Sequence, residues 1–293
     1  MAHNQAINTN AGVGQGANLE ITTRGSSWYF AVCAIMGVAT IFFWAMSLTK
    51  KNQTHRLFHY IAAGITFVAC ITYFTMGSNL GQVPIPVEFP RRGDEQVGAA
   101  GTREVFYVRY IDWFITTPLL LLHLLLTAGM PRPSIMCTIF ADWIMVVCGL
   151  VGALVSTRFK WGFWTFGTAA FLFVVWQILF DGRRHAAALG GSIQKTYLSG
   201  GVLLIFVWFL YPIAWGLSEG GNVIHPDSEA IFYGVLDIVA KVGFGAILLV
   251  GHRNIDPADL GLGIRHPPVT NPSWGSVADQ DGQPQHPASS TLS

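Results

Sequence analysis

Residues 230–251 read AIFYGVLDIVAKVGFGAILLVG, an apolar run whose charged residues are Asp237 and Lys241. As an α-helix this run is about 33 Å long, which matches a bilayer hydrocarbon core of about 30 Å. Because Asp237 and Lys241 are four positions apart, one helical turn brings the carboxylate and the amine onto the same face. The stretch therefore predicts a membrane-spanning helix with an acid and an amine side by side inside the membrane.

Six further apolar runs of similar length precede this one, separated by polar connectors. They cover residues 27–48, 57–79, 103–127, 133–155, 161–181 and 196–217. The composition agrees, since 52% of the residues are hydrophobic and 11% are charged, whereas about a quarter are charged in soluble domains. Only continuous helices satisfy the backbone in lipid, and a β-barrel would show short alternating segments instead. We predict an all-α integral membrane protein, a seven-transmembrane-helix bundle.

The rest of the chain predicts two flanking segments around the bundle of residues 27–251. Residues 1–26 are polar and lack the apolar core of a cleavable signal peptide. Residues 252–293 are rich in Pro, Gly, Ser and His without periodicity, which is typical of a disordered tail. The long connector of residues 82–101, with prolines around short β-branched pieces, predicts a small β-hairpin between the second and third helices.

Basic residues predict the orientation of the bundle. On the side of the C-terminus lie Lys50, Lys51, Arg56, Arg132, Arg183, Arg184, Lys195, Arg253 and Arg265. On the other side lie Arg24, Arg91, Arg92, Arg103, Arg158 and Lys160. This asymmetry predicts a multi-pass protein of the plasma membrane with an extracellular N-terminus and a cytoplasmic C-terminus. The net charge of +1, without a basic cluster longer than a pair, argues against a nucleic-acid partner.

Charged residues also fall inside other predicted helices: Arg109, Asp112 and Asp142. An ionisable side chain in the membrane costs at least about 2.5–3.5 kcal/mol and by default indicates function. Arg109 and Asp112 are three positions apart, and Asp112 and Thr116 are four apart, so the third helix presents all three along one stripe. A purely structural ion-pair cluster is the alternative, but such clusters stabilise a fold little relative to apolar packing.

The neighbours of the buried lysine indicate what it binds. A primary amine can condense with an aldehyde to form a Schiff base. Trp208, Tyr211 and Trp215 follow one helical face, and Trp113 stands beside Asp112, so flat walls surround a long slot. Aromatic stripes also occur in ordinary cores and on lipid-facing surfaces. Here the aromatic residues converge on a buried lysine with two acids, and they therefore favour an elongated, apolar, conjugated aldehyde as the ligand.

Four stretches resemble the microbial (type I) rhodopsins, the bacteriorhodopsin-like proteins. Residues 109–122 (RYIDWFITTPLLLL) resemble their third-helix signature, and residues 236–245 (LDIVAKVGFG) resemble their retinal-lysine motif. Residues 208–215 (WFLYPIAW) are similar to their sixth helix and residues 141–145 (ADWIM) to their fourth. The resemblance runs from residue 27 to residue 251 and is greatest to fungal and other eukaryotic proton-pumping members.

This resemblance implies a role for individual residues. Lys241 would carry all-trans retinal as a covalent protonated Schiff base, with Asp112 and Asp237 as counter-ions and Asp112 as the proton acceptor. Thr116 would hydrogen-bond Asp112, and Arg109 would respond when Asp112 becomes neutral. Glu219 and Glu229 resemble the glutamate pair that releases protons. The implied retinal-pocket residues are Trp113, Thr117, Leu120, Asp142, Met145, Gly149, Trp208, Tyr211, Trp215 and Tyr73.

The pattern departs from the family at His123, which follows Asp112 by eleven residues, about 16 Å along nearly the same helical face. Proton pumps of the family carry a carboxylic donor at this position. His123 is then an alternative donor, a poor donor that slows the cycle, or a structural residue. We predict a light-driven outward proton pump with an altered donor site, not an enzyme. A slow-cycling photosensory rhodopsin that signals through a partner is the alternative.

Other classes and partners follow from the same residues. A G-protein-coupled receptor is disfavoured, because the third helix does not end in Asp/Glu-Arg-Tyr and the seventh lacks Asn-Pro-x-x-Tyr. Chloride or sodium pumping is disfavoured because Asp112 and Thr116 keep the proton-pump pattern, and the four cysteines lack metal-ligand spacing. The expected partners are retinal, protons and membrane lipid. Because family members often trimerise, a homo-oligomer such as a trimer is also expected.

Overall fold

The computed structural model describes residues 4–11, 16–50, 53–91 and 101–260. All of these belong to a unit of residues 1–262, which is separate from a segment of residues 263–293. The predicted disordered tail therefore lies, from residue 261 onward, outside the described residues. The central part of the 82–101 connector, residues 92–100, also lies outside them.

Seven helical segments of the described part are long and apolar enough to cross a membrane, which confirms the predicted fold class. The first six contain α2 (Thr23–Leu48), α3 (Gln53–Gly77), α4 (Tyr107–Thr127), α5 (Arg132–Leu154), α6 (Lys160–Trp176) and α8 (Gly191–Trp215). The sixth segment includes a π-helical turn, Gly216–Gly220, after α8. The fifth continues from α6 through a π-helical turn, Gln177–Gly182, into α7 (Arg183–Leu189). The seventh consists of α9 (Pro226–Asp237), a π-helical turn (Ile238–Gly243) and α10 (Phe244–Gly251).

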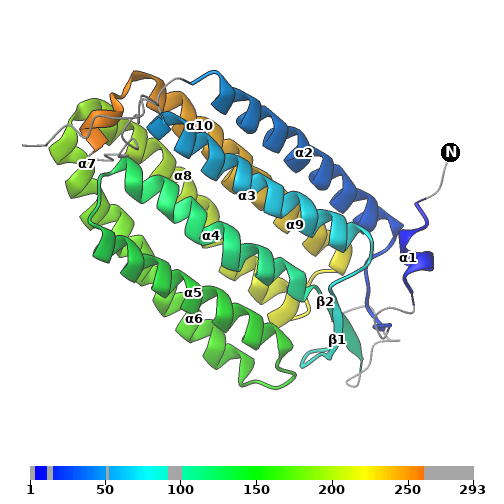
Figure 1. Cartoon of the computed structure of the whole chain (residues 1–293). Helices are drawn as coiled ribbons and strands as arrows, with labels where there is room; N and C mark the ends of the chain where they lie inside the picture. The colour runs from blue at the N-terminus through cyan, green and yellow to red at the C-terminus, as the bar shows by residue number, and fades with distance from the viewer. Residues whose placement is uncertain (1–3, 12–15, 51–52, 92–100, 261–293) are drawn as a thin grey trace, which may run out of the picture. The chain divides into compact units, whose positions relative to one another are not determined.

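The helices pack in chain order and close into a ring. Each of α2 to α5 contacts the next helix, α6 and α10 contact α8, and α9 returns to α2 (Figure 1). Leucines such as Leu121, Leu124 and Leu248 are fully buried within the ring. Phe166 and Phe206 are two-thirds exposed on it, as expected of side chains that face lipid.

A two-stranded sheet lies at the end of the bundle where α4 begins (Figure 1), which we name the hairpin end. β1 (Val83–Pro86) pairs antiparallel with β2 (Thr102–Val105), so the predicted hairpin is confirmed. The predicted start of the third helix at Arg103 is wrong, since α4 begins at Tyr107. The reason is that β2 uses its backbone in the sheet, and the Glu104 amide also donates to the Leu19 carbonyl (2.9 Å).

The N-terminal segment is tied to the hairpin end. α2 begins at Thr23, four residues before its predicted start, because the Thr22 hydroxyl caps it by accepting from the Arg24 amide. The Thr22 amide and hydroxyl both donate to the Asp227 carboxylate, at 2.8 and 2.6 Å. The start of α2 is thereby linked to the first turn of α9.

Proline residues interrupt two helices beside the ring interior. Pro118 in α4 has no N–H, so the carbonyl of Phe114, four residues earlier, loses its helical partner. The indole N–H of Trp143 on α5 donates to that carbonyl at 3.1 Å. The proline thus creates an attachment point between α4 and α5. In α8, which contains Pro212, the carbonyl of that proline itself accepts from the indole N–H of Trp164 of α6 (3.2 Å).

Candidate functional site

The centre of the site is Lys241, which lies in the π-helical turn between α9 and α10. Such turns widen a helix locally and occur frequently at functional sites. The Lys241 Nζ donates to Asp112 of α4 and lies 3.1 Å from Oδ2 of Asp237, one turn earlier on the same segment. All three side chains are about 1% exposed. The fold thus brings together the amine and the two carboxylates that the sequence singled out.

The two carboxylates differ in their surroundings. Tyr73 of α3 donates to Oδ2 of Asp237 at 2.7 Å, and Tyr211 of α8 donates to its Oδ1 at 2.5 Å. The Lys241 amine contacts Oδ2 of Asp112, whereas the buried Oδ1 of Asp112 has no partner among the described residues. Asp237 is therefore held by two hydroxyl groups, and Asp112 keeps one oxygen free.

Thr116 hydrogen-bonds the backbone of Asp112. Its hydroxyl donates to the backbone carbonyl of Asp112 at 2.9 Å, not to the carboxylate. Threonine hydroxyls in helices commonly bond the carbonyl four residues earlier. Thr116 therefore lies next to the acid without satisfying it.

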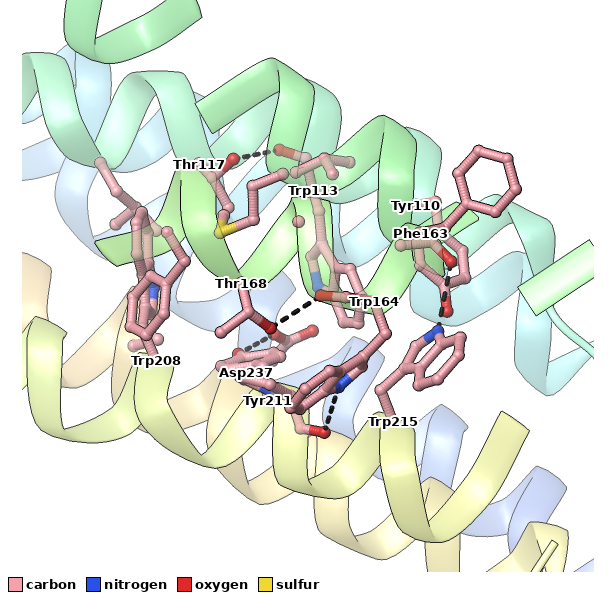
Figure 2. Close-up of a pocket in the computed structure, with 18 of the residues that line it drawn as sticks. Tyr110, Trp113, Thr117, Phe163, Trp164, Thr168, Trp208, Tyr211, Trp215 and Asp237 are labelled. Carbon is pink, nitrogen blue, oxygen red and sulfur yellow. Dashed lines mark hydrogen bonds between the residues drawn. The ribbon is translucent and has the colours of Figure 1, made fainter. Parts of the chain in front are cut away.

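An almost wholly apolar cavity lies between α4, α5, α6 and α8 (Figure 2), and Lys241 is among the residues that line it. Predicted pocket residues that line it are Trp113, Thr117, Leu120, Met145, Gly149, Trp208, Tyr211 and Trp215, together with Asp237 and Lys241. Trp113 meets Tyr211 edge to face, with ring centroids 5.2 Å apart. The aromatic slot expected from the sequence is thus assembled from several helices.

One wall of the cavity was not predicted. α6 contributes Phe163, Trp164, Gly167, Thr168 and Phe171. Nothing in the sequence marks these residues, because an apolar helix without a charged or motif residue does not reveal which face is turned inward. The same α6 face also carries the indole that bonds the Pro212 carbonyl.

Two predicted pocket residues lie behind the wall instead of lining it. Asp142 of α5 accepts from the hydroxyl of Thr117 at 2.7 Å, and its other oxygen is buried without a partner among the described residues. Tyr73 reaches the site through its bond to Asp237. Both residues support groups that face the cavity.

The side chains around the cavity fit an elongated apolar aldehyde. Its walls are aromatic, and the primary amine among the described residues that line it, that of Lys241, lies between two acids. Two buried polar atoms beside it, Asp112 Oδ1 and Trp113 Nε1, lack a partner among the described residues. An amine that can bond covalently and walls that can stack on a flat chain are what retinal requires.

Toward the hairpin end, Arg109 binds two glutamates and not Asp112, its neighbour on α4. Arg109 Nη1 lies 2.6 Å from Glu229 Oε1 and 3.2 Å from Glu219 Oε1. Its Nη2 donates to the Tyr29 hydroxyl at 2.9 Å, and the guanidinium covers the Tyr233 ring, 4.2 Å from the centroid. The two predicted release-group acids are therefore held together through one arginine.

The surroundings of the two glutamates are unequal. Glu229 also pairs with Arg103 of β2, whose Nη2 lies 2.5 Å from Oε2. Glu219 instead accepts weaker bonds from Tyr110 (3.1 Å) and Tyr233 (3.2 Å). Sequence reasoning missed Arg103 because a charge in a connector resembles a solvated loop residue, yet it is 2% exposed. Two cations thus bind the carboxylate of Glu229, and among the described residues one cation binds the carboxylate of Glu219.

A third carboxylic acid at this end was also missed. Glu104 of β2 is 1% exposed and accepts from the Ile21 amide at 2.9 Å. Its Oε1 is buried without a partner among the described residues. Burial raises the pKa of Glu104 to about 8, although the Ile21 amide opposes this rise. Glu104 therefore carries a proton at neutral pH.

At the opposite end, which we name the histidine end, His123 of α4 is fully buried. It is stacked on Phe58 of α3, with ring centroids 5.2 Å apart. Neither ring nitrogen has a hydrogen-bond partner among the described residues. His123 is thus an apolar-packed imidazole on the same helix as Asp112, as its spacing predicted.

Comparisons with known proteins agree with this geometry. The family model described as bacteriorhodopsin-like protein matches residues 24–255. The opsin-like protein carO of Fusarium fujikuroi is 55% identical over 264 residues, which cover 89% of this chain and 85% of that protein. Opsin-1 of Neurospora crassa is 36% identical over 234 residues, covering 77% of this chain and 74% of that protein.

A solved structure shows the same fold. The light-driven proton pump LR (Mac) from Leptosphaeria maculans superposes with a TM-score of 0.75 at 38% identity, covering 81% of this chain and all of that one. Members of this family are light-driven ion pumps or photoreceptors, not enzymes, and they normally bind retinal. The chain is a seven-helix membrane protein that belongs to the bacteriorhodopsin-like family.

Proposed function

We propose that this chain is a light-driven outward proton pump in which all-trans retinal is linked covalently to Lys241. The observation that carries the proposal is the Lys241 amine, held between Asp112 and Asp237 beside an aromatic-walled cavity. Its likeness to LR (Mac), a light-driven proton pump, supports the same activity. Asp112, the carboxylate with a free oxygen, is the group that would take the proton.

The assignment of the acceptor follows from the hydrogen bonds. When bound, retinal supplies light absorption and a light-triggered fall in the proton affinity of the nitrogen that carries it. Asp237 receives two tyrosine hydroxyls, one on each carboxylate oxygen. Asp112 lacks such donors on its carboxylate and keeps one oxygen free among the described residues, so it is the acid with room for a proton that leaves Lys241 Nζ.

The outward route continues through the arginine and the glutamates. Arg109 lies one turn from Asp112 toward the hairpin end, and neutralising Asp112 changes the field at its guanidinium by one charge. Arg109 in turn forms ion pairs with Glu219 and Glu229, so a change at its guanidinium alters the charge that both glutamates experience. Because Glu229 is held ionised by two arginines, we assign Glu219 as the acid that gives up the released proton.

The inward half depends on His123 in place of a carboxylic donor. We propose that this histidine passes protons toward Lys241 and that the hairpin end faces outside, with an extracellular N-terminus and a cytoplasmic C-terminus. Location in the plasma membrane, lipid contacts and a homo-oligomer such as a trimer stay predictions. The second candidate, a slow-cycling photosensory rhodopsin, is favoured by one observation: the imidazole at the donor position has no hydrogen-bond partner in the described part of the chain.

One experiment separates the two candidates. Full-length protein with retinal is reconstituted into vesicles of known orientation, and the external pH is recorded under illumination with and without an uncoupler. We expect proton movement from the histidine end to the hairpin end that the uncoupler abolishes. Asp112→Asn should keep the colour and lose the movement, while Asp256→Asn, beyond the last span, should keep both. Coloured wild-type protein that moves no protons would favour the photosensory role.

A further inference from the structure

The histidine end contains more titratable groups than the donor position. His252 follows α10 directly and is 3% exposed. Its ring lies 5.8 Å from that of His123 and 4.2 Å from that of Phe58, measured between centroids. Two buried imidazoles, one from α4 and one that follows α10, are therefore packed around one phenylalanine.

The hydrogen bonds around Thr127 favour one tautomer of His252. Its Nε2 lies 2.9 Å from the hydroxyl oxygen of Thr127 on α4. That hydroxyl already donates its hydrogen to the His123 carbonyl at 2.8 Å. A threonine hydroxyl carries a single hydrogen, so while that hydrogen lies on the His123 carbonyl, Nε2 is the donor in its bond to Thr127. In this arrangement the proton of the neutral ring lies on Nε2, and Nδ1 carries the lone pair.

This lone pair is unused in the packed structure. Nδ1 of His252 is buried and has no partner among the described residues, like both nitrogens of His123. Structural buried histidines normally satisfy their ring nitrogens, because an unpartnered buried polar atom costs about 1–3 kcal/mol. Three unpartnered nitrogens on two adjacent rings thus point to a function. One water molecule can bridge the rings of His123 and His252, whose centroids are 5.8 Å apart.

We propose that His252 and His123 form a two-imidazole proton relay that supplies Lys241 from the histidine end, with Thr127 orienting His252. The proposal rests on the proposed pump function. In the relay, a proton from water bonds to Nδ1 of His252, which becomes cationic. That N–H bond then breaks as the proton passes to a ring nitrogen of His123, and His252 returns to its neutral form with Nε2 still bonded to Thr127. His123, now cationic, becomes neutral again when a proton leaves it toward Lys241.

The charge state agrees with a relay that holds no stored proton. Burial lowers the pKa of His252 to about 3, with smaller contributions from His55 and His59 of α3. The His252 ring also lies beside the His123 ring, and an added charge on one of them would repel a charge on the other. His252 therefore rests neutral, and each turnover must draw its proton from the solution on this side.

This mechanism predicts a pH dependence that a carboxylic donor would not show. A protonated acid holds its proton in advance, so transfer from it does not depend on the proton concentration outside. A neutral relay takes up its proton during the cycle. The rate of proton uptake at the histidine end should therefore fall as pH rises, by up to about tenfold per pH unit.

The kinetic test compares matched variants of the full-length, retinal-loaded protein. His252→Gln keeps an amide N–H for Thr127 but cannot carry the proton, so we expect proton uptake at the histidine end to slow about a hundredfold. His123→Asn should slow it similarly, and release at the hairpin end should keep its rate. The control is His185→Gln on α7, a half-buried histidine outside the cluster, which should behave as wild type.

A second measurement does not depend on pumping. Nitrogen-15 NMR of histidine-labelled protein in membranes, in the dark, should show His252 neutral at pH 6, with a proton on Nε2 and none on Nδ1. Thr127→Val removes the oxygen that accepts from Nε2, so it should give a mixture of both tautomers. Comparison with His252→Gln identifies the signal.

The outcomes separate the relay from the pump. If wild type pumps and His252→Gln takes up protons at the wild-type rate, the relay is wrong even though the pump stands. A cationic His252 at pH 6, or a proton on Nδ1, also overturns it. If wild type does not pump, the proposed function fails, and the NMR signature still shows whether His252 has the free base the relay requires.

Discussion

Arg103 and Glu229 form a buried ion pair at the hairpin end, with Nη2 of the arginine 2.5 Å from Oε2 of the glutamate. Arg103 also donates to the Asn222 side chain and to the Ile224 carbonyl, both at 2.7 Å. A strand of the hairpin thus reaches over the end of the bundle and holds the start of α9. The hairpin is therefore part of the charge network and more than a cover.

Replacing this arginine should affect both stability and proton release. Arg103→Gln leaves Glu229 with Arg109 as its remaining cation, so we expect the free energy of unfolding to fall by about 1–3 kcal/mol. Glu229 then competes with Glu219 for a proton, which should delay release at the hairpin end. Denaturant unfolding and a pH-sensitive dye measure the two effects. Arg158→Gln, exposed at the same end, is the control; equal behaviour of both variants would contradict the assigned role.

Glu104 should make the stability of the hairpin end depend on pH. Its pKa of about 8 in the folded protein is raised above the ordinary value of 4.5. The unfolded chain therefore loses this proton first, and stability falls as pH rises from about 4.5 to about 8. Glu104→Gln removes the effect. Thermal unfolding should show that raising the pH from 5 to 8.5 lowers the melting temperature of wild type more than that of Glu104→Gln. Equal changes in melting temperature for both proteins would show that Glu104 is not a buried neutral acid.

Lys241 should be indispensable for colour. Lys241→Ala removes the amine that could bond to an aldehyde, so added all-trans retinal should produce no visible absorption band. Lys195→Ala changes an exposed lysine on α8 and should produce the wild-type band. Absorption spectroscopy after addition of retinal makes the comparison. A stable, light-responsive colour in Lys241→Ala would exclude the covalent link.

Gly182 is expected to be intolerant of a side chain. A Cβ at this position would lie 2.0 Å from the Tyr197 hydroxyl, which donates to the Ile178 carbonyl at 2.7 Å. Gly182→Ala should therefore displace the tyrosine and lower the free energy of unfolding by about 1–3 kcal/mol. A Cβ at Gly162 would have no atom within 4 Å, so Gly162→Ala should change the free energy of unfolding by less than about 1 kcal/mol. Equal losses would show that packing at Tyr197 is not the cause.

The sequence by itself determined the features that are local to one helix. Apolar runs of bilayer length predict the seven crossings, because a backbone in lipid has no other way to satisfy its hydrogen bonds. The four-residue spacing of Asp237 and Lys241 likewise specifies their ion pair, since both belong to one turn. The resemblance of the third-helix stretch identified Asp112 as the second acid.

Only the tertiary structure decided which helices contact one another and at which axial position each one lies. Arg109 pairs with Glu219 and Glu229 and not with Asp112, three residues away on its own helix. The α6 wall, the Arg103 ion pair and the contact between His123 and His252 likewise join distant segments. Such contacts depend on the rotation and axial position of each helix in the bundle. Hydrophobic periodicity within one apolar helix carries little information on either, because lipid-facing and buried faces are both apolar.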